Sequence, residues 1–376
     1  MRPRDTQGGV IDRVLSSNAN LAVFGAAGTG KSYVRDEIAA VVPAIILGPT
    51  GISVVRAPNA MTIARFLGVR VKAADARTLV ANFIPPANLS AYTIIIDEIS
   101  MVAPEDLAAI DLALRGACNA SVVCGGLRII LIGDPLQMEP VNAPIPFFET
   151  HVYTKLVAAG LLVCVLKHNF RLCSGDEDVV DMANFLADCR VGRLGTATTA
   201  LLNYVVNRRK KPDDAIRLFA ENADVSAYNL TRLHSHAGPF INHGGVNYKV
   251  GAPVMVTQNI YRPNSSTIKC ANGSVGVITG VTTKGVVVTT DSGTFGFSSP
   301  NVPLAFAWAL TVAKAQGLTL KKVVVSGKNL AHPGQAYVAV SRVARLSDVY
   351  GDNLEESNFT VARNPALRAF QELHNL

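Results

Sequence analysis

Short apolar runs alternate with stretches that favour helices along the first third of the chain. The clearest runs cover residues 21–24, 44–47, 94–96 and 128–132. Continuous apolar runs of this length are typical of strands that are buried on both faces of a parallel sheet. Polar residues or glycine follow these runs, and in such a sheet they lie along its carboxyl edge. The pattern therefore predicts an α/β domain that binds its ligands at this edge.

A glycine-rich turn lies between the run 21–24 and a helical stretch that begins at Ser32. It reads Gly-Ala-Ala-Gly-Thr-Gly-Lys-Ser, which is the spacing of a P-loop. Glycine leaves backbone N–H groups open to phosphate oxygens, and the following helix offers the positive end of its dipole. We therefore expect ATP with Mg²⁺, and Ser32 as a ligand of the metal. The residues expected to bind the nucleotide are Gly25, Gly28, Thr29, Gly30, Lys31 and Ser32.

Two carboxylates, Asp97 and Glu98, follow the buried run 94–96. Hydrolysis of ATP needs one carboxylate that holds Mg²⁺, usually through water, and another that orients or deprotonates the attacking water. We assign the metal to Asp97 and the general base to Glu98. Two acidic residues after a strand would alone more often form a solvated turn, but the P-loop upstream favours the functional interpretation.

Three further residues are candidates for the catalytic machinery. Gln137 ends the segment Gly-Asp-Pro-Leu-Gln, where it can sense the γ-phosphate or its water. Arg171 and Arg342 are candidate arginine fingers from a second domain, because phosphoryl transfer needs cations where negative charge develops. Each of these signals is weak by itself, since a lone arginine is more often a surface residue.

The second half of the chain returns to the α/β pattern and then changes its texture. Its apolar runs cover residues 161–166, 216–220 and 323–325. Between about 245 and 305, short β-branched segments alternate with glycine, asparagine, serine and proline, which predicts a small inserted β-barrel. We expect a first domain at 1–145, with a small projection at about 69–92, and a second domain at 146–376.

Composition limits the class of protein without deciding its function. Of 376 residues, 49% are hydrophobic and 17% are charged, so the chain is expected to fold. No apolar run approaches the roughly 20 residues that span a bilayer, and the first residues do not resemble a secretory leader. We therefore expect an intracellular protein without membrane contact. The net charge of +7 permits a polyanionic partner but does not require one.

The motifs, taken in order, resemble superfamily 1 helicases of the Pif-type branch, which is related to RecD and to the phage Dda helicase. Each motif alone is weak, but the ordered set is specific and extends along nearly the whole chain. The matching segments are 25–32, 97–102, 125–126, 133–137, 140–141, 169–171, 222–229, 251–255, 272–276, 309–320 and 337–342. The short chain is most similar to compact bacterial or viral members.

The resemblance implies two RecA-like domains with ATP between them and an SH3-like barrel inserted in the second. It also implies a monomer that moves 5′ to 3′ on single-stranded DNA, opens forked DNA, and serves DNA replication, repair or recombination. By the same resemblance, Gln7 reads the adenine. Gln316 matches a strand-contacting motif of the second domain and could equally contact the nucleotide. The residues that match strand-contacting motifs are Thr50, Gly51, Thr62, Thr311 and Lys314.

The chain departs from the family pattern at Ala64 and Ala313, where histidine is common. Two other functions stay open, and the two alanines keep the second of them possible. A viral RNA helicase of the alphavirus-like type shares the P-loop, the two carboxylates and the Gly-Asp-Pro-Leu-Gln segment, and it would act in a host cell rather than in a bacterial cytoplasm. Alternatively, the chain is an ATPase switch that nucleic acid stimulates and that separates no strands.

Overall fold

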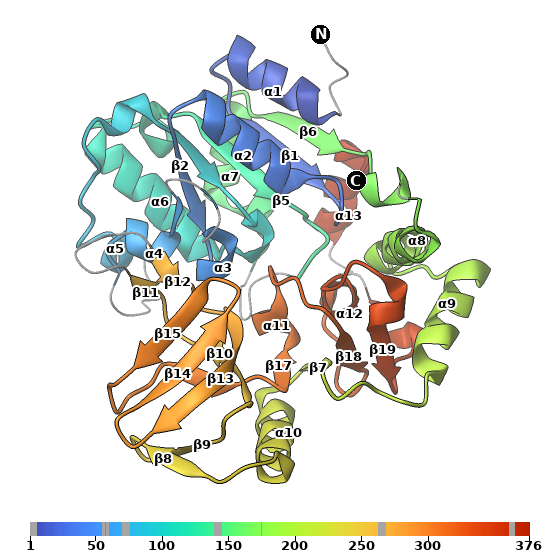
Figure 1. Ribbon diagram of the computed structural model, residues 1–376. Coiled ribbons are helices and arrows are strands. Elements are labelled where there is room, and N and C mark those ends of the chain that lie inside the picture. Colours follow the sequence, from blue (N-terminus) through green and yellow to red (C-terminus); the bar gives the residue numbers. More distant parts are fainter. Residues whose placement is uncertain are drawn as a thin grey trace. The chain divides into compact units, whose positions relative to one another are not determined.

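A parallel sheet of six strands organises the first part of the chain (Figure 1). The strands follow one another in the order β3-β2-β4-β5-β1-β6. Their bounds are β1 (Leu21–Gly25), β2 (Ala44–Gly48), β3 (Ala60–Thr62), β4 (Thr93–Ile96), β5 (Ile129–Gly133) and β6 (Leu162–Leu166). The apolar runs of the first third form four of these strands, so the prediction of a parallel α/β sheet is confirmed.

This computed structural model describes residues 6–54, 57, 60–69, 76–138, 145–173, 175–261, 268–360 and 365–376. The chain divides into two compact units, Met1–Gly192 with Val361–Leu376 and Arg193–Thr360. This division differs from the expected one after residue 145. Strand β6 joins the first sheet because it pairs in parallel with β1 along its whole length.

Helices cover both faces of the first sheet, because successive residues of a strand point to opposite sides. Phe24 and Ile96 share a core with α6, α7 and α13, whereas Val23 and Ile95 share one with α1 and α2. The longer helices of this unit are α1 (Gln7–Ser16), α2 (Lys31–Val41), α6 (Pro104–Ala117), α7 (His151–Ala158), α8 (Glu177–Val191) and α13 (Pro365–His374). The first unit is therefore a layer of strands between two layers of helices.

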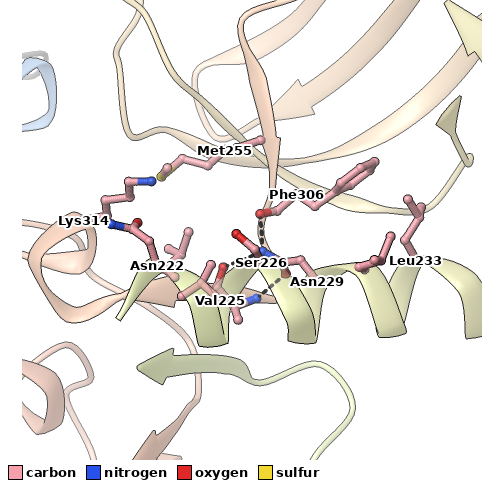
Figure 2. A pocket seen from close by; sticks show the side chains of 12 residues that line it. Asn222, Val225, Ser226, Asn229, Leu233, Met255, Phe306 and Lys314 are labelled. Atoms are coloured by element: carbon pink, nitrogen blue, oxygen red, sulfur yellow. Dashed lines mark hydrogen bonds between the residues drawn. The ribbon is translucent and has the colours of Figure 1, made fainter. Parts of the chain in front are cut away.

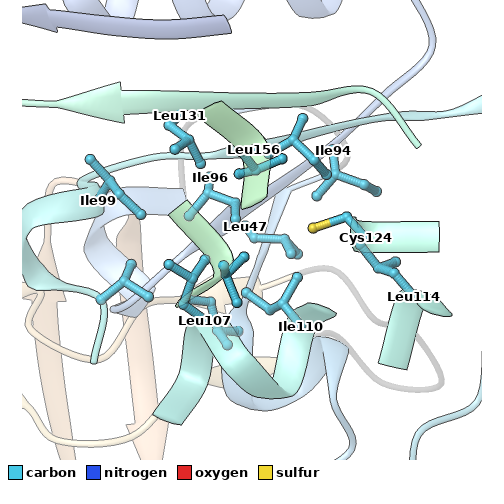
Figure 3. Close-up of a cluster of buried hydrophobic side chains, with 14 of the residues drawn as sticks. Leu47, Ile94, Ile96, Ile99, Leu107, Ile110, Leu114, Cys124, Leu131 and Leu156 are labelled. Carbon is cyan, nitrogen blue, oxygen red and sulfur yellow. The ribbon is translucent and has the colours of Figure 1, made fainter. Parts of the chain in front are cut away.

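One of these two cores lies between the sheet and α6 (Figure 3). Ile94 and Ile96 of β4 share it with Leu107, Ile110 and Leu114 of α6, and all five side chains are at most 1% exposed. Proline begins α6 and two acidic residues follow in its first turn, as a helix N-terminus prefers. This packing fixes the end of β4 and therefore the two carboxylates that follow it.

The segment 69–92, expected to project from the first domain, lies partly outside the described residues. In its described part, Leu79 and Leu89 are buried in the core beneath α6. The ring of Phe83 packs against Phe66 with 5.1 Å between ring centroids. This part of the segment therefore packs onto the first unit. The short helices nearby are α3 (Gly51–Val54), α4 (Ile63–Phe66) and α5 (Ala76–Leu79).

The second unit has a parallel sheet in the order β17-β7-β18-β19. Its strands are β7 (Ile216–Phe219), β17 (Ala309–Thr311), β18 (Val323–Ser326) and β19 (Val349–Asp352). Its helices are α9 (Thr196–Asn207), α10 (Asn222–Ser235), α11 (Val312–Ala315) and α12 (Gln335–Val340). The runs at 216–220 and 323–325 are thus confirmed as strands of an α/β unit.

An antiparallel sheet is inserted in sequence between β7 and β17, in the order β15-β14-β13-β10-β16. Its strands are β10 (Pro253–Val256), β13 (Val275–Thr282), β14 (Gly285–Thr290), β15 (Gly293–Phe297) and β16 (Leu304–Phe306). Two-stranded ribbons are formed by β8 (Ile241–His243) with β9 (Val246–Tyr248), and by β11 (Ile260–Tyr261) with β12 (Ile268–Cys270). The change of sequence texture near residue 245 therefore marks a β-rich insertion. Over the described ranges, none of the helices has the length and apolar character needed to cross a membrane.

Phe370 anchors α13 in the first unit. Its ring stacks on Phe148 at 4.5 Å between centroids and meets Phe24 and Tyr153 at 5.7 and 5.9 Å. We expect Phe370→Ala to lower the free energy of unfolding of this unit by about 3–5 kcal/mol, because it leaves a cavity. Urea denaturation followed by circular dichroism measures the change. Leu373 of the same helix is 77% exposed, so Leu373→Ala should cost less than about 0.5 kcal/mol. Equal losses would contradict this packing.

Candidate nucleotide-binding site

The candidate residues of the first unit follow the carboxyl ends of its strands, apart from Gln7. Because all six strands are parallel, these ends lie along one edge of the sheet. Across the sheet, the edge carries Thr62 at the end of β3, Thr50 and Gly51 after β2, Asp97 and Glu98 after β4, Gln137 after β5, the P-loop after β1 and Arg171 after β6. The fold thus gathers residues that lie far apart in the sequence.

The P-loop turns from β1 into α2 with Gly28 and Gly30 in the left-handed region, at φ angles of 88° and 81°. The side-chain amide of Gln7 donates a hydrogen bond to the Thr29 carbonyl oxygen at 3.1 Å. A Cβ atom on Gly30 would collide with this amide, and one on Gly28 would lie 2.5 Å from Oδ1 of Asn169. Both glycines are therefore required by backbone conformation and by close approach.

Lys31 is the first residue of α2, and its amine is held inside the P-loop. It donates hydrogen bonds to the carbonyl oxygens of Gly25 at 2.8 Å and of Ala26 at 3.0 Å. Burial lowers the pKa of Lys31, although the carboxylates of Asp134 and Glu98 act in the opposite direction. The amine thus has acceptors in the loop that phosphate oxygens can replace.

Asp97 and Glu98 leave β4 with different surroundings and backbone conformations. Asp97 is buried; its Oδ1 accepts from the Glu98 backbone N–H at 2.9 Å and its Oδ2 from Nη1 of Arg35 at 2.7 Å. Glu98 has a φ of 51°, which costs a non-glycine residue about 1–3 kcal/mol. Backbone strain of this kind is common at active sites. The two carboxylates thus have different surroundings, which agrees with separate roles in metal binding and in general-base catalysis.

The oxygen donors at this edge fit a magnesium ion that is bound together with a nucleotide. Ser32 is exposed at the start of α2, and Asp97 offers a carboxylate. Among the described side chains, no group of three or more histidine, cysteine, aspartate or glutamate residues could hold a metal. Mg²⁺ usually needs only one or two protein oxygens, because phosphates and water complete its octahedron. A hydroxyl and a carboxylate are therefore a suitable donor set.

The sequence did not predict the buried ion pair at the end of β5. Asp134 is fully buried, and Arg190 of α8 donates to its carboxylate from Nε at 3.1 and 3.2 Å and from Nη2 at 2.8 Å. Burial opposes ionisation, but Arg190 and Lys31 outweigh it and lower the pKa of the Asp134 carboxyl. Arg190 lies beside a stripe of buried apolar residues on α8. A charged residue within an apolar stripe indicates a buried ion pair, and this was the signal that the sequence offered.

The segment after β6 contacts the P-loop from within the first unit. The Phe170 backbone N–H donates to the Gly28 carbonyl oxygen at 3.1 Å, and the Asn169 side chain donates to that of Ala27 at 3.2 Å. Cδ of Arg171 lies 3.1 Å from the position of a Cβ on Gly28. Arg171 belongs to the first unit, so the expectation that it comes from the second domain is wrong. Its catalytic role stays a prediction.

Phe170 is an exposed aromatic residue at the P-loop that sequence reasoning did not single out. Its side chain is 48% exposed, and it meets the ring of His168 edge-on at 4.6 Å between centroids. It also comes within 3.7 Å of the Cβ position of Gly30, which Gln7 contacts as well. An aromatic face and a side-chain amide beside one glycine can together bind a planar base.

Thr62 and Thr311 hold equivalent positions in the two units. Each ends a strand and caps a four-residue helix, accepting from the backbone N–H of Arg65 or Lys314 at 3.3 Å. A hydroxyl that accepts one hydrogen bond can still donate its proton to a phosphate oxygen. Thr62 is 9% and Thr311 5% exposed, and their contact with a strand stays a prediction.

Lys314 also lines a pocket of about 400 Å³ in the second unit (Figure 2). Asn222 of α10 and Phe306 of β16 contribute to its wall, which is mainly apolar. The side-chain amide of Asn229 donates to the carbonyl oxygens of Phe306 and Ala309 at 2.9 and 3.1 Å. Asn229, within the helicase-like segment 222–229, thus joins α10 to β16 and β17.

Arg342 and Gln316 are buried within the second unit. The Arg342 guanidinium donates to the carbonyl oxygens of Val338 at 2.7 Å and Leu318 at 3.2 Å, and to the Ser341 hydroxyl at 2.6 Å. Gln316 directly follows α11 and is 5% exposed. The contact of these two residues with nucleotide stays a prediction.

The P-loop and the carboxylates at one edge of a helix-covered parallel sheet define a P-loop NTPase. Within this class, the family described as PIF1-like helicase matches residues 4–201 of the chain. Because the match covers more than half of its length, the chain belongs to the PIF1-like helicase family. The resemblance to Pif-type helicases found in the ordered motifs is thereby confirmed.

Relatives and solved structures agree with this assignment. The chain is 25% identical to the ATP-dependent DNA helicase PIF1 of Danio rerio, over 90% of the chain and 59% of the relative. It is 25% identical to the ATP-dependent DNA helicase Pif1 of Bdellovibrio bacteriovorus, over 88% of the chain and 83% of the relative. The crystal structure of Bacteroides Pif1 helicase with ADP-AlF3 and ssDNA shares its fold, with a TM-score of 0.76 at 22% identity, covering 98% of this chain and 96% of that one. The chain spans about three fifths of the length of its vertebrate relatives.

Removing Arg190 should destabilise the first unit, because it leaves the buried Asp134 carboxylate without its main counter-charge. We expect Arg190→Met to lower the free energy of unfolding by about 3–5 kcal/mol, measured by urea denaturation. Arg232 of the second unit is the control, since it pairs with Asp213 at 3.1 Å and that carboxylate is 92% exposed. Arg232→Met should cost less than about 1 kcal/mol. Similar losses in both variants would refute the importance of the buried pair.

Proposed function

We propose that the protein is an ATP-dependent DNA helicase that moves 5′ to 3′ on single-stranded DNA and separates duplex DNA. Membership of the PIF1-like helicase family supports this class of function. The observation that carries the proposal is the shared edge of the first sheet. Lys31, the carboxylates after β4 and Thr50 all lie along this edge, so ATP chemistry and strand contact would share one rigid support.

In this proposal the P-loop binds the phosphates of ATP, and Lys31 neutralises charge on the β- and γ-phosphates. Ser32 and Asp97 hold Mg²⁺, which when bound neutralises charge on the phosphates. Glu98 accepts the proton of the attacking water. Gln137 orients this water.

Cations complete the site where negative charge develops during phosphoryl transfer. Arg171 lies beside the P-loop within the first unit, so it would act without movement of the second unit. Arg342 and Gln316 would act from the second unit. Because Arg342 now donates to groups of its own unit, it would have to exchange these hydrogen bonds for a phosphate oxygen.

The adenine ring would lie between the side-chain amide of Gln7 and the exposed ring of Phe170. Both side chains approach Gly30, which places them on the P-loop itself. The ring supplies stacking area, and the amide supplies a donor and an acceptor for the edge of the base.

We further propose that the two units are RecA-like domains and that the inserted antiparallel sheet is an SH3-like barrel. Thr50, Gly51 and Thr62 would hold the strand on the first domain, and Thr311 and Lys314 on the second. Hydroxyl donors and an ammonium suit phosphate oxygens, and backbone contacts of this kind bind nucleic acid without reading its sequence. The two domains would bind the strand in alternation, which would move the protein along single-stranded DNA to a fork. It would act as a monomer inside a cell.

A second candidate is an ATPase switch that nucleic acid stimulates and that does not separate strands. Ala64 and Ala313 favour it, because each is the second residue of the short helix that follows a strand-contacting threonine. An apolar side chain at both positions removes a polar contact beside each threonine. Strand affinity, or its coupling to hydrolysis, would then be weaker.

Unwinding of matched partial duplexes tests the proposal. The duplexes carry a 5′ or a 3′ tail and are made in DNA and in RNA. We expect ATP-dependent unwinding of 5′-tailed DNA only, and its loss in Lys31→Ala because the β- and γ-phosphates lose their cation. Unwinding of RNA would favour the viral RNA helicase. Hydrolysis without unwinding of any substrate would leave the switch.

Replacement of Phe170 should weaken ATP binding more than catalysis. Stacking of a base on an aromatic side chain is worth about 1–3 kcal/mol. We therefore expect Phe170→Ala to raise the KM for ATP by roughly tenfold and to change kcat by less than about twofold, because the ring contacts ground and transition states alike. Steady-state kinetics measure both constants. Leu172 is similarly exposed at 47%, so Leu172→Ala is the control and should change neither. A fall in kcat at constant KM would argue against stacking.

A further inference from the structure

Arg35 is a buried arginine of α2 that the proposed mechanism does not use. It is 7% exposed, and two nitrogen atoms of its guanidinium group donate to protein oxygens. Nε donates to Oδ1 of Asp36 at 2.8 Å, and Nη1 donates both to Oδ2 of Asp97 at 2.7 Å and to the Ser53 carbonyl oxygen at 3.2 Å. A single nitrogen atom therefore bridges the carboxylate after β4 and α3, the short helix after β2.

The contact with Arg35 sets the orientation of the Asp97 carboxylate. Asp97 is 6% exposed, and its other oxygen accepts from the backbone N–H of Glu98 at 2.9 Å. Both oxygens thus have a protein donor, and the lone pairs left for Mg²⁺ or its water point in directions that these donors fix. A small movement of the guanidinium would turn the carboxylate, because burial makes this ion pair strong.

On its other side, Arg35 contacts α3, the short helix that directly follows Thr50. The Ser53 hydroxyl donates to the Thr50 carbonyl oxygen at 2.7 Å, and the Ser53 backbone N–H donates to the Thr50 hydroxyl at 3.4 Å. A Cβ on Gly48 would collide with the Ser53 side chain, so this loop packs closely on the end of β2. Thr50 and the Ser53 carbonyl that Arg35 contacts therefore move together.

We propose that Arg35 is a positioning residue that couples strand binding at residues 50–53 to binding of the Mg²⁺–nucleotide at Asp97. This inference rests on the proposed function, since it takes Thr50 as a strand contact. A phosphate bound at Thr50 shifts the Ser53 carbonyl, and Arg35 passes the shift to Asp97. Lysine cannot replace it, because one ammonium on a flexible stem does not reproduce the planar fork that holds three acceptors at once.

The test measures binding rather than turnover. A fluorescent, non-hydrolysable ATP analogue is titrated into the intact chain with Mg²⁺, with and without a single-stranded oligodeoxynucleotide. The ratio of the two Kd values is the coupling factor, which is typically about 5–150 for linked sites. We expect Arg35→Lys to bring this factor to within about twofold of 1. With EDTA in place of Mg²⁺, the variant and the wild type should bind the analogue alike, because Arg35 acts through Asp97.

Two further variants make the result specific. Arg128 is another arginine of the first unit, and it directly precedes β5. It joins this strand to the segment before β1, because it donates to the carbonyl oxygens of Val14 at 2.9 Å and Ala19 at 3.2 Å. Arg128→Lys should keep the coupling factor of the wild type. Ser53→Ala leaves the charge of Arg35 in place but removes the hydroxyl contact with Thr50, so it should lower the factor. It also keeps the test decisive if Arg35→Lys does not fold.

The outcomes separate this inference from the proposed function. A coupling factor that stays at its wild-type value in folded Arg35→Lys or Ser53→Ala overturns the role of Arg35 and leaves the helicase proposal intact. A wild type that binds both ligands independently overturns the inference, because there is then no coupling to carry. A wild type that fails to bind either the analogue or the oligonucleotide contradicts the proposed function as well.

Discussion

The parallel direction of the six strands in the first unit is the constraint on which the site depends. Every strand ends at the same edge, so the segments that follow them are neighbours whatever their separation in the sequence. The edge is rigid because all described residues of β1, β2, β4 and β5 are buried between two layers of helices. Short loops of few residues can then hold a lysine, two carboxylates and a threonine at fixed positions.

Two buried carboxylates at this edge are each neutralised by an arginine. Asp97 is compensated by Arg35 and Asp134 by Arg190, and each of these four residues is at most 9% exposed. Buried ion pairs contribute little net stability, but loss of one partner is costly. Their value here is orientation, because both carboxylates follow strands of the sheet and would otherwise turn in their loops.

The sequence predicted what local patterns encode. Continuous apolar runs identified β1, β2, β4 and β5, and glycine spacing identified the P-loop. Ion pairs between residues far apart in the sequence were not predictable in this way. Arg35 pairs with Asp97, and Arg190 pairs with Asp134, across more than fifty positions of the chain. The run of β6 was recognised, but it was expected in the second domain, because a single sequence does not reveal which strand it pairs with. The return of α13 to the first unit was missed for the same reason.

In the proposed function, ATP chemistry and strand contact share one edge of one sheet. The most direct test measures steady-state ATP hydrolysis by the intact chain as single-stranded DNA is added. We expect hydrolysis to rise with DNA to a plateau and to be lost in Lys31→Ala at every DNA concentration. Hydrolysis at one rate with and without DNA would contradict this proposal, since the two functions would then not be linked.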